Sequence, residues 1–555
     1  MLDCEFVSPG HGGPPPAGWV ATREQGAWMF LKRFANDPIH DYSRAESVEG
    51  VGRAVEALRA TFGRTYPAII DGRPVETAKT IASLCPSDPS IVVGRTSSCS
   101  RDDVDRAMAA AKTAFASWSR TNPEERAETL LRLAALMRER RFELLALLPF
   151  EIGKDWYEAD AEIAEAIDFC EYYARLAIRQ FQYQPLTRLS TEDNCYSYIP
   201  LGVGAVISPW NFPLAILCGM TTAAVVGGNA VLVKPSSDTP VLASRLVDLA
   251  HEAGIPPGVI NLLPGSGGEI GDSLVTHPEI RFVAFTGSAD VGLRIQELVA
   301  KPDPRRKWMT RYVSEMGGKN AIVVDETADL EAASSAIVRS AFGFQGQKCS
   351  ACSRLVVDRR VKDALVERVL EKTKKLPAGN PWEGPCVFTG PVANRAAHAS
   401  ILEAIERGKK EARLLVGGRA LDRPGFYVAP TVFDGAASRS FLGQEEIFGP
   451  VLAVIEVGSF EEALSVANDT RYGLTGAVFS ASIDRLDLAK REFHCGNLYL
   501  NRGCTGAMVG VHPFGGFNLS GTDSKAGGPD YLMNFTQGKT TSERITIARL
   551  AGIGV

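Results

Sequence analysis

Two cysteines in the stretch GFQGQKCSACSR, Cys349 and Cys352, are the residues of this sequence best suited to carry chemistry. Their C-x-x-C spacing fits a redox dithiol, half of a zinc site, or one nucleophile with an inert neighbour. A zinc site needs a second Cys or His pair, and the sequence has neither another C-x-x-C nor an H-x₃₋₅-H, so we expect no metal. A thioredoxin-like dithiol would need a helix that begins at the first cysteine, within a much smaller domain. Taken alone, Cys349 could also be a buried structural thiol.

The size and composition of the chain narrow the class of protein. A chain of 555 residues is too long for one hydrophobic core, so we expect two or more domains. Hydrophobic residues make up 45% and charged residues 23%, as in ordinary globular proteins. The net charge is −5, and no stretch is both basic and aromatic, so we expect a small-molecule substrate and no nucleic acid.

The cysteines and the N-terminus bear on the compartment. Eleven scattered cysteines, an odd number, fit reduced thiols in a cytoplasmic enzyme better than a disulfide framework. The first twenty residues, MLDCEFVSPGHGGPPPAGWV, lack a basic region followed by an apolar one, so they do not resemble a secretory signal. Their Gly and Pro content predicts a disordered lead-in.

The stretch from Cys195 to Val233 contains no charged residue and could be mistaken for a membrane span. Pro209, Pro213 and Asn229 divide it into pieces that are too short to cross a bilayer as one helix. We therefore expect a buried strand, a turn, a short helix and a second buried strand, with no membrane association.

The residue composition and the hydrophobic periodicity change along the chain. Residues 103–181 are rich in Ala, Leu, Glu and Arg with helical periodicity. From about residue 200, short apolar runs alternate with helical stretches, which predicts a parallel sheet of βαβ units. A second such series follows Glu315. Two α/β domains that meet in a cleft are expected, with ligands at the carboxyl ends of the strands.

Two glycine-containing segments are weak signals of nucleotide binding. GSGGEIG (265–271) has a G-x-G-x-x-x-G spacing instead of the G-x-G-x-x-G fingerprint. FTGS (285–288) ends a predicted strand and precedes a helical stretch, where amides and the Ser288 hydroxyl could receive a phosphate. Neither segment decides the function by itself.

Four segments occur in a fixed order: SPWNFP (208–213), SEMGGK (314–319), GQKCSACSR (346–354) and EEIFGP (445–450). With this order and spacing, the chain resembles the aldehyde dehydrogenase superfamily over roughly residues 65–545. The resemblance implies an α/β fold with a Rossmann-type nucleotide-binding domain, an α/β catalytic domain and a small bridging β segment.

The resemblance implies a role for each catalytic residue. Cys349 is the expected nucleophile, because a thiolate adds to an aldehyde and later leaves from a thioester. Cys352 is then a small packing residue. The Asn211 amide and the backbone N–H of Cys349 would hold the developing oxyanion. Glu315 would be the general base for the water that hydrolyses the thioester.

The resemblance also implies NAD as cofactor. The residues expected to contact it lie in the segments named above and in the loops between them: Ser208, Pro209, Trp210, Lys234, Ser237, Gly267, Gly271, Thr286, Gly287, Ser288, Glu446 and Phe448. Ser237 stands where many NAD-preferring relatives carry a glutamate that repels a 2′-phosphate. NADP could therefore be tolerated.

The substrate is narrowed by the C-terminal stretch NRGCTGAMVGVHPFGGFNLSGTDSKAGGPDYL (501–532) together with FEIGKDWYEADAEIAEAIDFCEYYA (150–174). Both resemble the 1-pyrroline-5-carboxylate dehydrogenase branch of the superfamily, which oxidises L-glutamate γ-semialdehyde to L-glutamate in proline breakdown. The implied substrate contacts are Phe212, Lys348, Ser350, Gly506, Ala507 and Phe514. The amides of Gly506 and Ala507 with the Ser350 hydroxyl would anchor the carboxylate, and the two phenylalanines would enclose the aliphatic chain. His512 stands where relatives often have glutamine.

The resemblance further implies a domain division. Residues 1–65 would form a lead-in and helical arm, 66–188 with 201–314 the NAD-binding domain, and 315–512 the catalytic domain. Residues 189–200 and 526–550 resemble bridging and oligomerisation segments, which implies a homodimer or a dimer-based oligomer. The chain is too short for a fused proline dehydrogenase, so a separate enzyme would supply the substrate.

Two alternative functions remain open at this point. A dehydrogenase for another acidic semialdehyde, such as succinate or methylmalonate semialdehyde, would share the chemistry and differ only in the anchor loop 503–510. A cofactor-free thiol esterase or binding protein would leave Lys234, Glu446 and Phe448 without a role.

Overall fold

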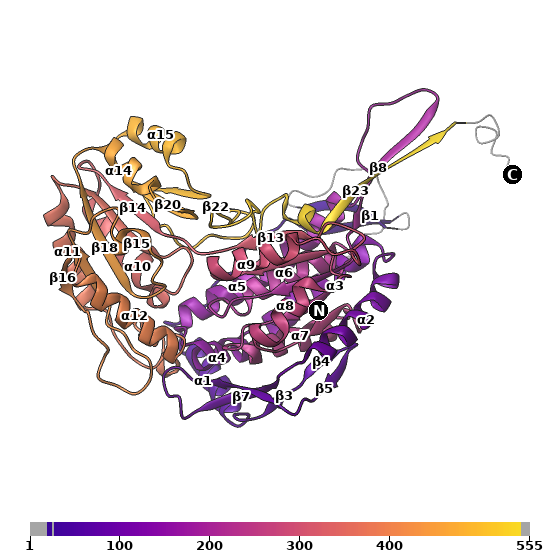
Figure 1. The fold of residues 1–555 in the computed structure, drawn as a ribbon, viewed down its shortest axis with the longest axis horizontal. Helices are drawn as coiled ribbons and strands as arrows, with labels where there is room; N and C mark the ends of the chain where they lie inside the picture. Colours follow the sequence, from indigo (N-terminus) through magenta and orange to yellow (C-terminus); the bar gives the residue numbers. More distant parts are fainter. Residues whose placement is uncertain (1–18, 25–26, 546–555) are drawn as a thin grey trace.

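Two seven-stranded sheets form the framework of the molecule (Figure 1). The structure, a computed structural model, describes residues 19–24 and 27–545. The first sheet has the order β13-β12-β9-β10-β11-β4-β5, and its first five strands are parallel. Its strands are β4 (Ala68–Ile70), β5 (Arg73–Val75), β9 (Val203–Ile207), β10 (Ala230–Lys234), β11 (Ile260–Leu262), β12 (Phe282–Thr286) and β13 (Arg311–Glu315).

The second sheet has the order β16-β17-β18-β15-β14-β20-β21, and all of its pairs except β16–β17 are parallel. Its strands are β14 (Asn320–Val324), β15 (Cys352–Asp358), β16 (Arg413–Val416), β17 (Thr431–Asp434), β18 (Val451–Val457), β20 (Thr475–Phe479) and β21 (Asn497–Leu500). Glu315 ends the first sheet and Asn320 begins the second, so the chain passes between the sheets at EMGGK.

Helices cover both sheets and bury their strands, as parallel sheets require. Around the first sheet lie α1 (Ala45–Arg59), α2 (Arg101–Trp118), α3 (Pro123–Glu139), α4 (Arg141–Ile152), α5 (Trp156–Gln180), α6 (Ala215–Val226), α7 (Pro240–Glu252), η1 (Gly267–Gly271), α8 (Asp272–Thr276) and α9 (Ala289–Ala300). Around the second lie α10 (Leu330–Phe342), η2 (Gly343–Gly346), α11 (Lys362–Lys374), η3 (Pro381–Glu383), α12 (Arg395–Gly408), α13 (Phe441–Gln444), α14 (Phe460–Asn468) and α15 (Ile483–Glu492).

Smaller pairs of strands complete the fold. They are β1 (Trp19–Glu24) with β2 (Ala27–Lys32), β3 (Thr65–Tyr66) and β6 (Thr80–Leu84) with β7 (Val92–Ser97), β19 (Tyr472–Gly473) with β22 (Phe517–Asn518), and β8 (Glu192–Pro200) with β23 (Thr536–Arg544). A short helix, η4 (Tyr531–Phe535), leads into β23. The β8–β23 ladder projects from the body of the molecule (Figure 1).

Local sequence signals explain where the predicted helical region 103–181 divides. Ser100 and Asp103 form a capping box at the start of α2. Gly153, with φ of 74°, ends α4, and the Asp155 side chain caps the start of α5. Gly153 and Asp155 therefore turn the chain from α4 into α5, the helix that runs beneath the candidate site.

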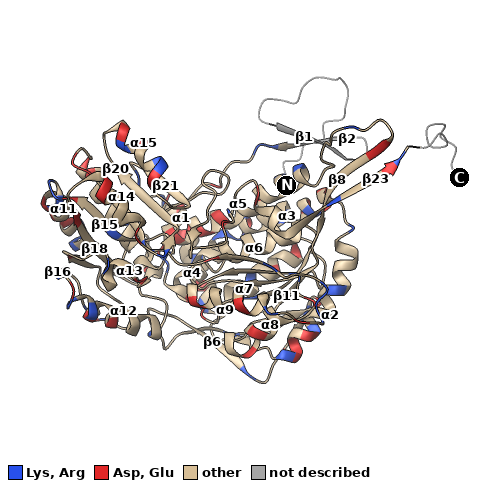
Figure 2. Ribbon diagram, turned by 45° about the horizontal axis from the view of Figure 1, so that its top comes forward, with Lys and Arg blue, Asp and Glu red and all other residues tan. Residues whose placement is uncertain are grey.

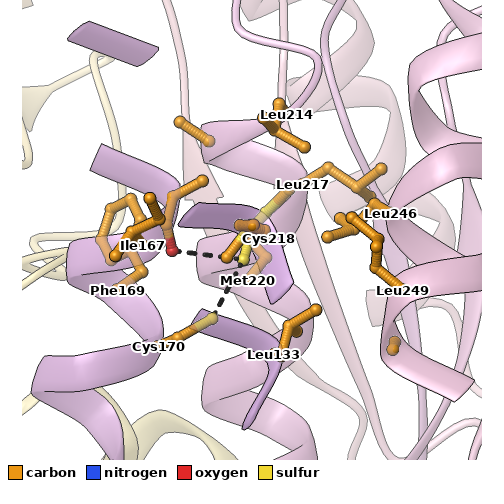
Figure 3. Packing of buried hydrophobic residues seen from close by; sticks show 14 of the residues in the cluster. Leu133, Ile167, Phe169, Cys170, Leu214, Leu217, Cys218, Met220, Leu246 and Leu249 are labelled. Carbon is orange, nitrogen blue, oxygen red and sulfur yellow. Dashed lines mark hydrogen bonds between the residues drawn. The ribbon is translucent and has the colours of Figure 1, made fainter. Parts of the chain in front are cut away.

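The charge-free stretch 195–233 folds as the sequence predicts, with β9, α6 and β10 in that order. Helix α6 is nearly all buried and packs on α5 and α7. Figure 3 shows this packing around Cys170 and Cys218, whose sulfur atoms are 3.5 Å apart. No helix in the part of the chain that the structure describes is both long and apolar enough to span a bilayer.

Acidic and basic residues both occur on outer helices such as α2 and α15 (Figure 2). The predicted N-terminal lead-in lies mostly outside the described residues. The predicted division into domains stays a prediction, and the membership of strands in two separate sheets supports it.

Candidate active site

The loop that carries Cys349 has an unusual backbone. It connects α10 to β15, and Phe344 and Gln345 have φ values of 48° and 54°. Gly346 follows with φ of 67°, and a Cβ atom there would lie 2.3 Å from the carbonyl oxygen of Gly449. Two buried non-glycine residues in the left-handed region indicate stored strain, which is typical of functional loops.

Two asparagines fix this loop. The Asn320 amide donates to the carbonyl oxygens of Cys349, at 2.7 Å, and Ala351, at 2.9 Å. The buried Asn211 amide donates to the carbonyl oxygen of Gln347 at 3.0 Å. One hydrogen of the Asn211 amide and the backbone N–H of Cys349 make no hydrogen bond within the described residues. The structure thus brings together the two predicted oxyanion donors.

Cys349 is half-buried in a turn before β15, and no helix begins at it. Burial, then the charges of Glu446 and Glu315, raise the pKa of its thiol to about 12. Without ligands, Cys349 is therefore a neutral thiol at neutral pH. Because the thiolate is the nucleophile, attack on a substrate requires a base or a compensating charge.

Glu315 ends β13 and lies among loops from the C-terminal part of the chain. Its carboxylate accepts hydrogen bonds from the Ser524 hydroxyl at 2.8 Å and the Gly516 amide at 3.3 Å. Burial raises its pKa to about 8, although both donors act in the opposite direction. A carboxyl group with such a pKa can accept a proton at neutral to mildly basic pH.

The two glycines of EMGGK make room for Glu446. The Gly318 amide donates to the Glu446 carboxylate at 2.9 Å, and a Cβ atom on Gly317 would lie 2.0 Å from that carboxylate. Burial raises the pKa of Glu446 to about 7. Both glycines of EMGGK thus lie against Glu446, one of the predicted cofactor residues.

The predicted cofactor residues gather at the carboxyl edge of the first sheet. Lys234 ends β10 and is buried, and within the described residues its one hydrogen bond goes to the carbonyl oxygen of Pro235, at 3.3 Å. Burial lowers its pKa to about 8. The Ser237 hydroxyl donates to the carbonyl oxygen of Gly265 at 3.4 Å, which joins the loops after β10 and β11.

The loop after β12 lies beside them. The Ser288 side chain caps α9, and the amide of Gly287 donates to the carbonyl oxygen of Glu315 at 3.1 Å. Thr286 ends β12. Gly267 and Gly271 bound the short π-helix η1, and Cβ atoms there would meet nothing within 4 Å.

An aromatic pair, Trp210 and Phe448, connects the carboxyl edge of the first sheet to the loop that carries Glu446. The rings of Trp210 and Phe448 meet edge to face, with centroids 5.3 Å apart, and Phe448 has φ of 54°. Pro209 and Trp210 are half-buried, whereas Ser208 is buried and its amide donates to the carbonyl oxygen of Lys234 at 3.2 Å.

The predicted substrate residues surround Cys349 from other elements. Phe212 follows Asn211, and its nearest aromatic ring is Phe344, with centroids 6.4 Å apart. Lys348 forms an ion pair of 2.6 Å with Glu158 on α5. The structure records no ring contact between Phe212 and Phe514, so their enclosure of a substrate stays a prediction.

The anchor loop contacts the nucleophile loop through Cys504. Its thiol donates to the carbonyl oxygen of Ser350 at 3.3 Å. Arg502 donates to the carbonyl oxygens of Thr505 and Gly506, at 2.9 and 3.1 Å, and so holds the loop closed. The amides of Gly506 and Ala507 make no hydrogen bond within the described residues. The remaining notable residue, His512, contacts Arg502 at 3.2 Å inside the loop.

Sequence reasoning missed several residues of this region. Asn320 and Ser524 hold Cys349 and Glu315, and Lys154, Glu162 and Glu165 lie beneath the loop. The three α5 carboxylates, Glu158 included, stand at 158, 162 and 165, a spacing that places them on one helix face. The sequence shows this spacing, but it does not show which residues pair with the three carboxylates.

Comparison with known proteins identifies the family to which the chain belongs. Residues 74–541 match the Aldehyde dehydrogenase family. The chain belongs to this family. The predicted resemblance and the α/β fold are therefore confirmed.

The relatives of this aldehyde dehydrogenase are similar over nearly its whole length. A 1-pyrroline-5-carboxylate dehydrogenase of Anoxybacillus flavithermus is 51% identical over 514 residues, which cover 93% of this chain and 100% of the relative. One from Geobacillus thermodenitrificans has the same identity and coverage. The solved structure of a 1-pyrroline-5-carboxylate dehydrogenase from Thermus with bound NAD has a TM-score of 0.91 at 48% identity, and covers 93% of this chain and 100% of that one.

A longer protein is also similar. The chain matches proline utilization A of Bdellovibrio bacteriovorus with a TM-score of 0.91 and 41% identity, over 92% of this chain and 53% of that one.

Proposed function

We propose that this aldehyde dehydrogenase oxidises L-glutamate γ-semialdehyde, the open form of 1-pyrroline-5-carboxylate, to L-glutamate in proline degradation. The observation that carries the proposal is the anchor loop, with two unbonded backbone amides joined to the nucleophile loop through Cys504 and Ser350. Neighbouring free amides suit a carboxylate. The relatives of about 50% identity that are named for 1-pyrroline-5-carboxylate support the same substrate.

A carboxyl group near Cys349 supports an amino-acid aldehyde. Glu165 lies close enough to raise the pKa of the Cys349 thiol, and it has no hydrogen bond or ion pair within the described residues. Burial raises the pKa of Glu165 to about 8, and an ammonium group beside it would favour its ionised form. A substrate with a carboxylate for the anchor loop and an ammonium group for Glu165 therefore fits the site.

NAD is the cofactor we propose, and the residues at the sheet edge fit a dinucleotide. The buried ammonium of Lys234 has a single long hydrogen bond, so it can serve ribose hydroxyls, and Ser288 at the start of α9 suits a phosphate. Glu446, Trp210 and Phe448 would hold the nicotinamide end. A bound nicotinamide would supply the hydride acceptor that the side chains lack. The Thermus relative binds NAD, and Ser237, which has no carboxylate, also leaves room for NADP.

The chain's own chemistry begins at Cys349. The thiol first loses its proton to a base, and the thiolate then attacks the aldehyde carbon, so that the carbonyl oxygen becomes an alkoxide. The N–H of Cys349 and the Asn211 amide donate to that oxygen. As the C=O bond forms again, hydride leaves the carbon, and a thioester remains on Cys349.

Glu315 then acts on water. Its carboxylate removes a proton as the water oxygen attacks the thioester, and the Cys349 sulfur leaves as thiolate. The product is a carboxylic acid, and Cys349 is ready for another aldehyde. The Ser524 hydroxyl and the Gly516 amide hold the Glu315 carboxylate in position through hydrogen bonds.

A matrix of steady-state rates tests the proposal. Purified protein is assayed with 1-pyrroline-5-carboxylate, succinate semialdehyde and methylmalonate semialdehyde, each with NAD and NADP. We expect the highest kcat/KM with 1-pyrroline-5-carboxylate and NAD. A preference above about tenfold for succinate semialdehyde would contradict the assignment. Ester cleavage without any cofactor-dependent oxidation would favour the esterase alternative.

The proposal includes the setting of the enzyme. We propose a cytoplasmic enzyme, since the ten cysteines that the structure describes are free thiols. A separate proline dehydrogenase would supply the substrate, and in the Bdellovibrio relative the matched region is 53% of a longer chain. The projecting β8–β23 ladder would join subunits of a homodimer or larger oligomer, because it forms a sheet of only two strands within the described residues.

A further inference from the structure

A lysine that neither the sequence motifs nor the mechanism uses lies beneath the candidate site. Lys154 follows the glycine that ends α4, and its side chain is fully buried. A buried ammonium is rare unless it is paired, and here the partner is Glu162 on α5. Burial lowers the pKa of Lys154, while Glu162 acts in the opposite direction.

Glu162 links this lysine to the oxyanion turn. One carboxylate oxygen pairs with Lys154. The other accepts hydrogen bonds from the amides of Leu214, at 2.8 Å, and Ala215, at 3.2 Å, where α6 begins. The turn that carries Asn211 and Phe212 directly precedes those amides. A charged Glu162 at the start of α6 therefore fixes the turn.

Lys154 also contacts one predicted substrate residue, Phe212, directly. Its Nζ atom lies 3.6 Å from the centroid of the Phe212 ring and 4.7 Å from that of Phe344. A desolvated cation over a ring face is attractive. The lysine therefore forms part of the support for one wall of the aldehyde pocket.

The charges around Glu165 show what this lysine contributes. Glu158 is neutralised by Lys348 and Glu162 by Lys154, which leaves Glu165 as the unpaired carboxylate on this face of α5. Burial, then the charge of Glu162, raise the pKa of Glu165 to about 8. Asp168 adds to this effect, while Lys154 and Lys348 oppose it. Loss of Lys154 would leave excess negative charge, and Glu165 would then hold its proton more tightly.

We propose that Lys154 is a positioning residue that makes the pocket selective for amino-acid aldehydes: its buried charge pairs with Glu162, and Glu165, one helical turn away, can then give up its proton to solvent when the substrate's ammonium group binds. The inference rests on the proposed function. It adds a reason for selectivity that lies one layer away from the substrate.

The test compares two aldehydes of equal chain length in four proteins: wild type, K154M, E162Q and K154M/E162Q. L-Glutamate γ-semialdehyde carries charges and pentanal carries none. We expect K154M to lower kcat/KM for the semialdehyde about tenfold or more, chiefly through KM, and to change pentanal less than about threefold. E162Q alone should keep the preference, because the amide oxygen of the new glutamine still accepts from the α6 amides.

The double variant separates charge from packing. K154M/E162Q removes the excess negative charge, so we expect it to recover most of the loss seen in K154M. K154R should also retain the preference. A double variant no better than K154M, or a parallel fall for both aldehydes with an unchanged melting temperature, would overturn the inference. A wild-type enzyme without preference for the semialdehyde would instead contradict the proposed function.

Discussion

Two groups of carboxyl groups near Cys349 have different partners. Within the described residues, Glu315 and Glu446 accept hydrogen bonds from amides and one hydroxyl and form no ion pair, and burial raises their pKa values to about 8 and about 7. Glu158 and Glu162 each pair with a lysine. Burial raises the pKa of Glu158, but the charge of Lys348, its hydrogen bond and the charges of Lys154 and Arg339 together outweigh burial, and the net pKa lies below the ordinary value.

The difference in partners distinguishes carboxylates that change their protonation state during catalysis from carboxylates that keep their charge. Neutral donors stabilise a carboxylate only partly against burial, so its pKa stays near the working pH. A lysine partner keeps a carboxylate charged throughout the neutral range. Glu315 and Glu446, near the nucleophile, can thus change their protonation, whereas Glu158, paired with Lys348, keeps its charge.

The largest effect should come from replacement of the nucleophile, Cys349. C349A should lower turnover by about 10⁴-fold or more, because no other group can form the thioester. C352A should retain at least about a third of the activity, since Cys352 is a buried residue at the start of β15. Steady-state rates decide this, and comparable losses from both variants would revive a dithiol mechanism.

A smaller loss is expected from the base. E315Q should slow turnover by about 10²–10⁴-fold, because the glutamine cannot take a proton from water. Rapid mixing should still show a burst of reduced cofactor, since thioester formation precedes this step. Absence of a burst would place Glu315 in acylation instead.

The pH profile sharpens the comparison further. A carboxyl group with its pKa raised to about 8 is protonated below that pH, so kcat should rise with pH through about 8 where thioester hydrolysis limits turnover. S524A removes a hydrogen bond to the ionised form, so the rise should move to higher pH by about one unit. A shift to lower pH, or none, would mean that another group controls the rise.

The smallest predicted effect concerns the charge of Glu446. E446Q removes a negative charge that raises the pKa of the Cys349 thiol. Alkylation of ligand-free enzyme by iodoacetamide at mildly basic pH should be faster by about threefold, as a drop of about half a pKa unit gives. Labelling of C349A under the same conditions measures the background from other thiols, and slower alkylation of E446Q would contradict the electrostatic argument.

Much of this arrangement could be predicted because certain sequence motifs are specific to one structural context. The order of SPWNFP, SEMGGK, GQKCSACSR and EEIFGP sufficed to predict the fold, and the uncharged stretch 195–233 its strand–helix–strand core. The structure places Asn211 against the nucleophile loop, as expected. The assigned roles of the site residues remain predictions.

Other features required three-dimensional packing. Lys154 and Glu162 stand eight residues apart in a helical region, where charges are usually solvated, and only the passage of α5 beneath α6 buries them together. Asn320 follows a recognised motif, yet its amide contacts a loop almost thirty positions later. Such long-range partners leave no periodic signature in the sequence.

The meeting of Gly346 with Gly449 has a practical consequence for redesign. The two chain segments touch main chain to main chain, with no side chain between them to absorb a shift. Anyone who grafts a new EEIFGP segment to alter coenzyme choice would also displace the thiol. The two segments should therefore be exchanged as one block.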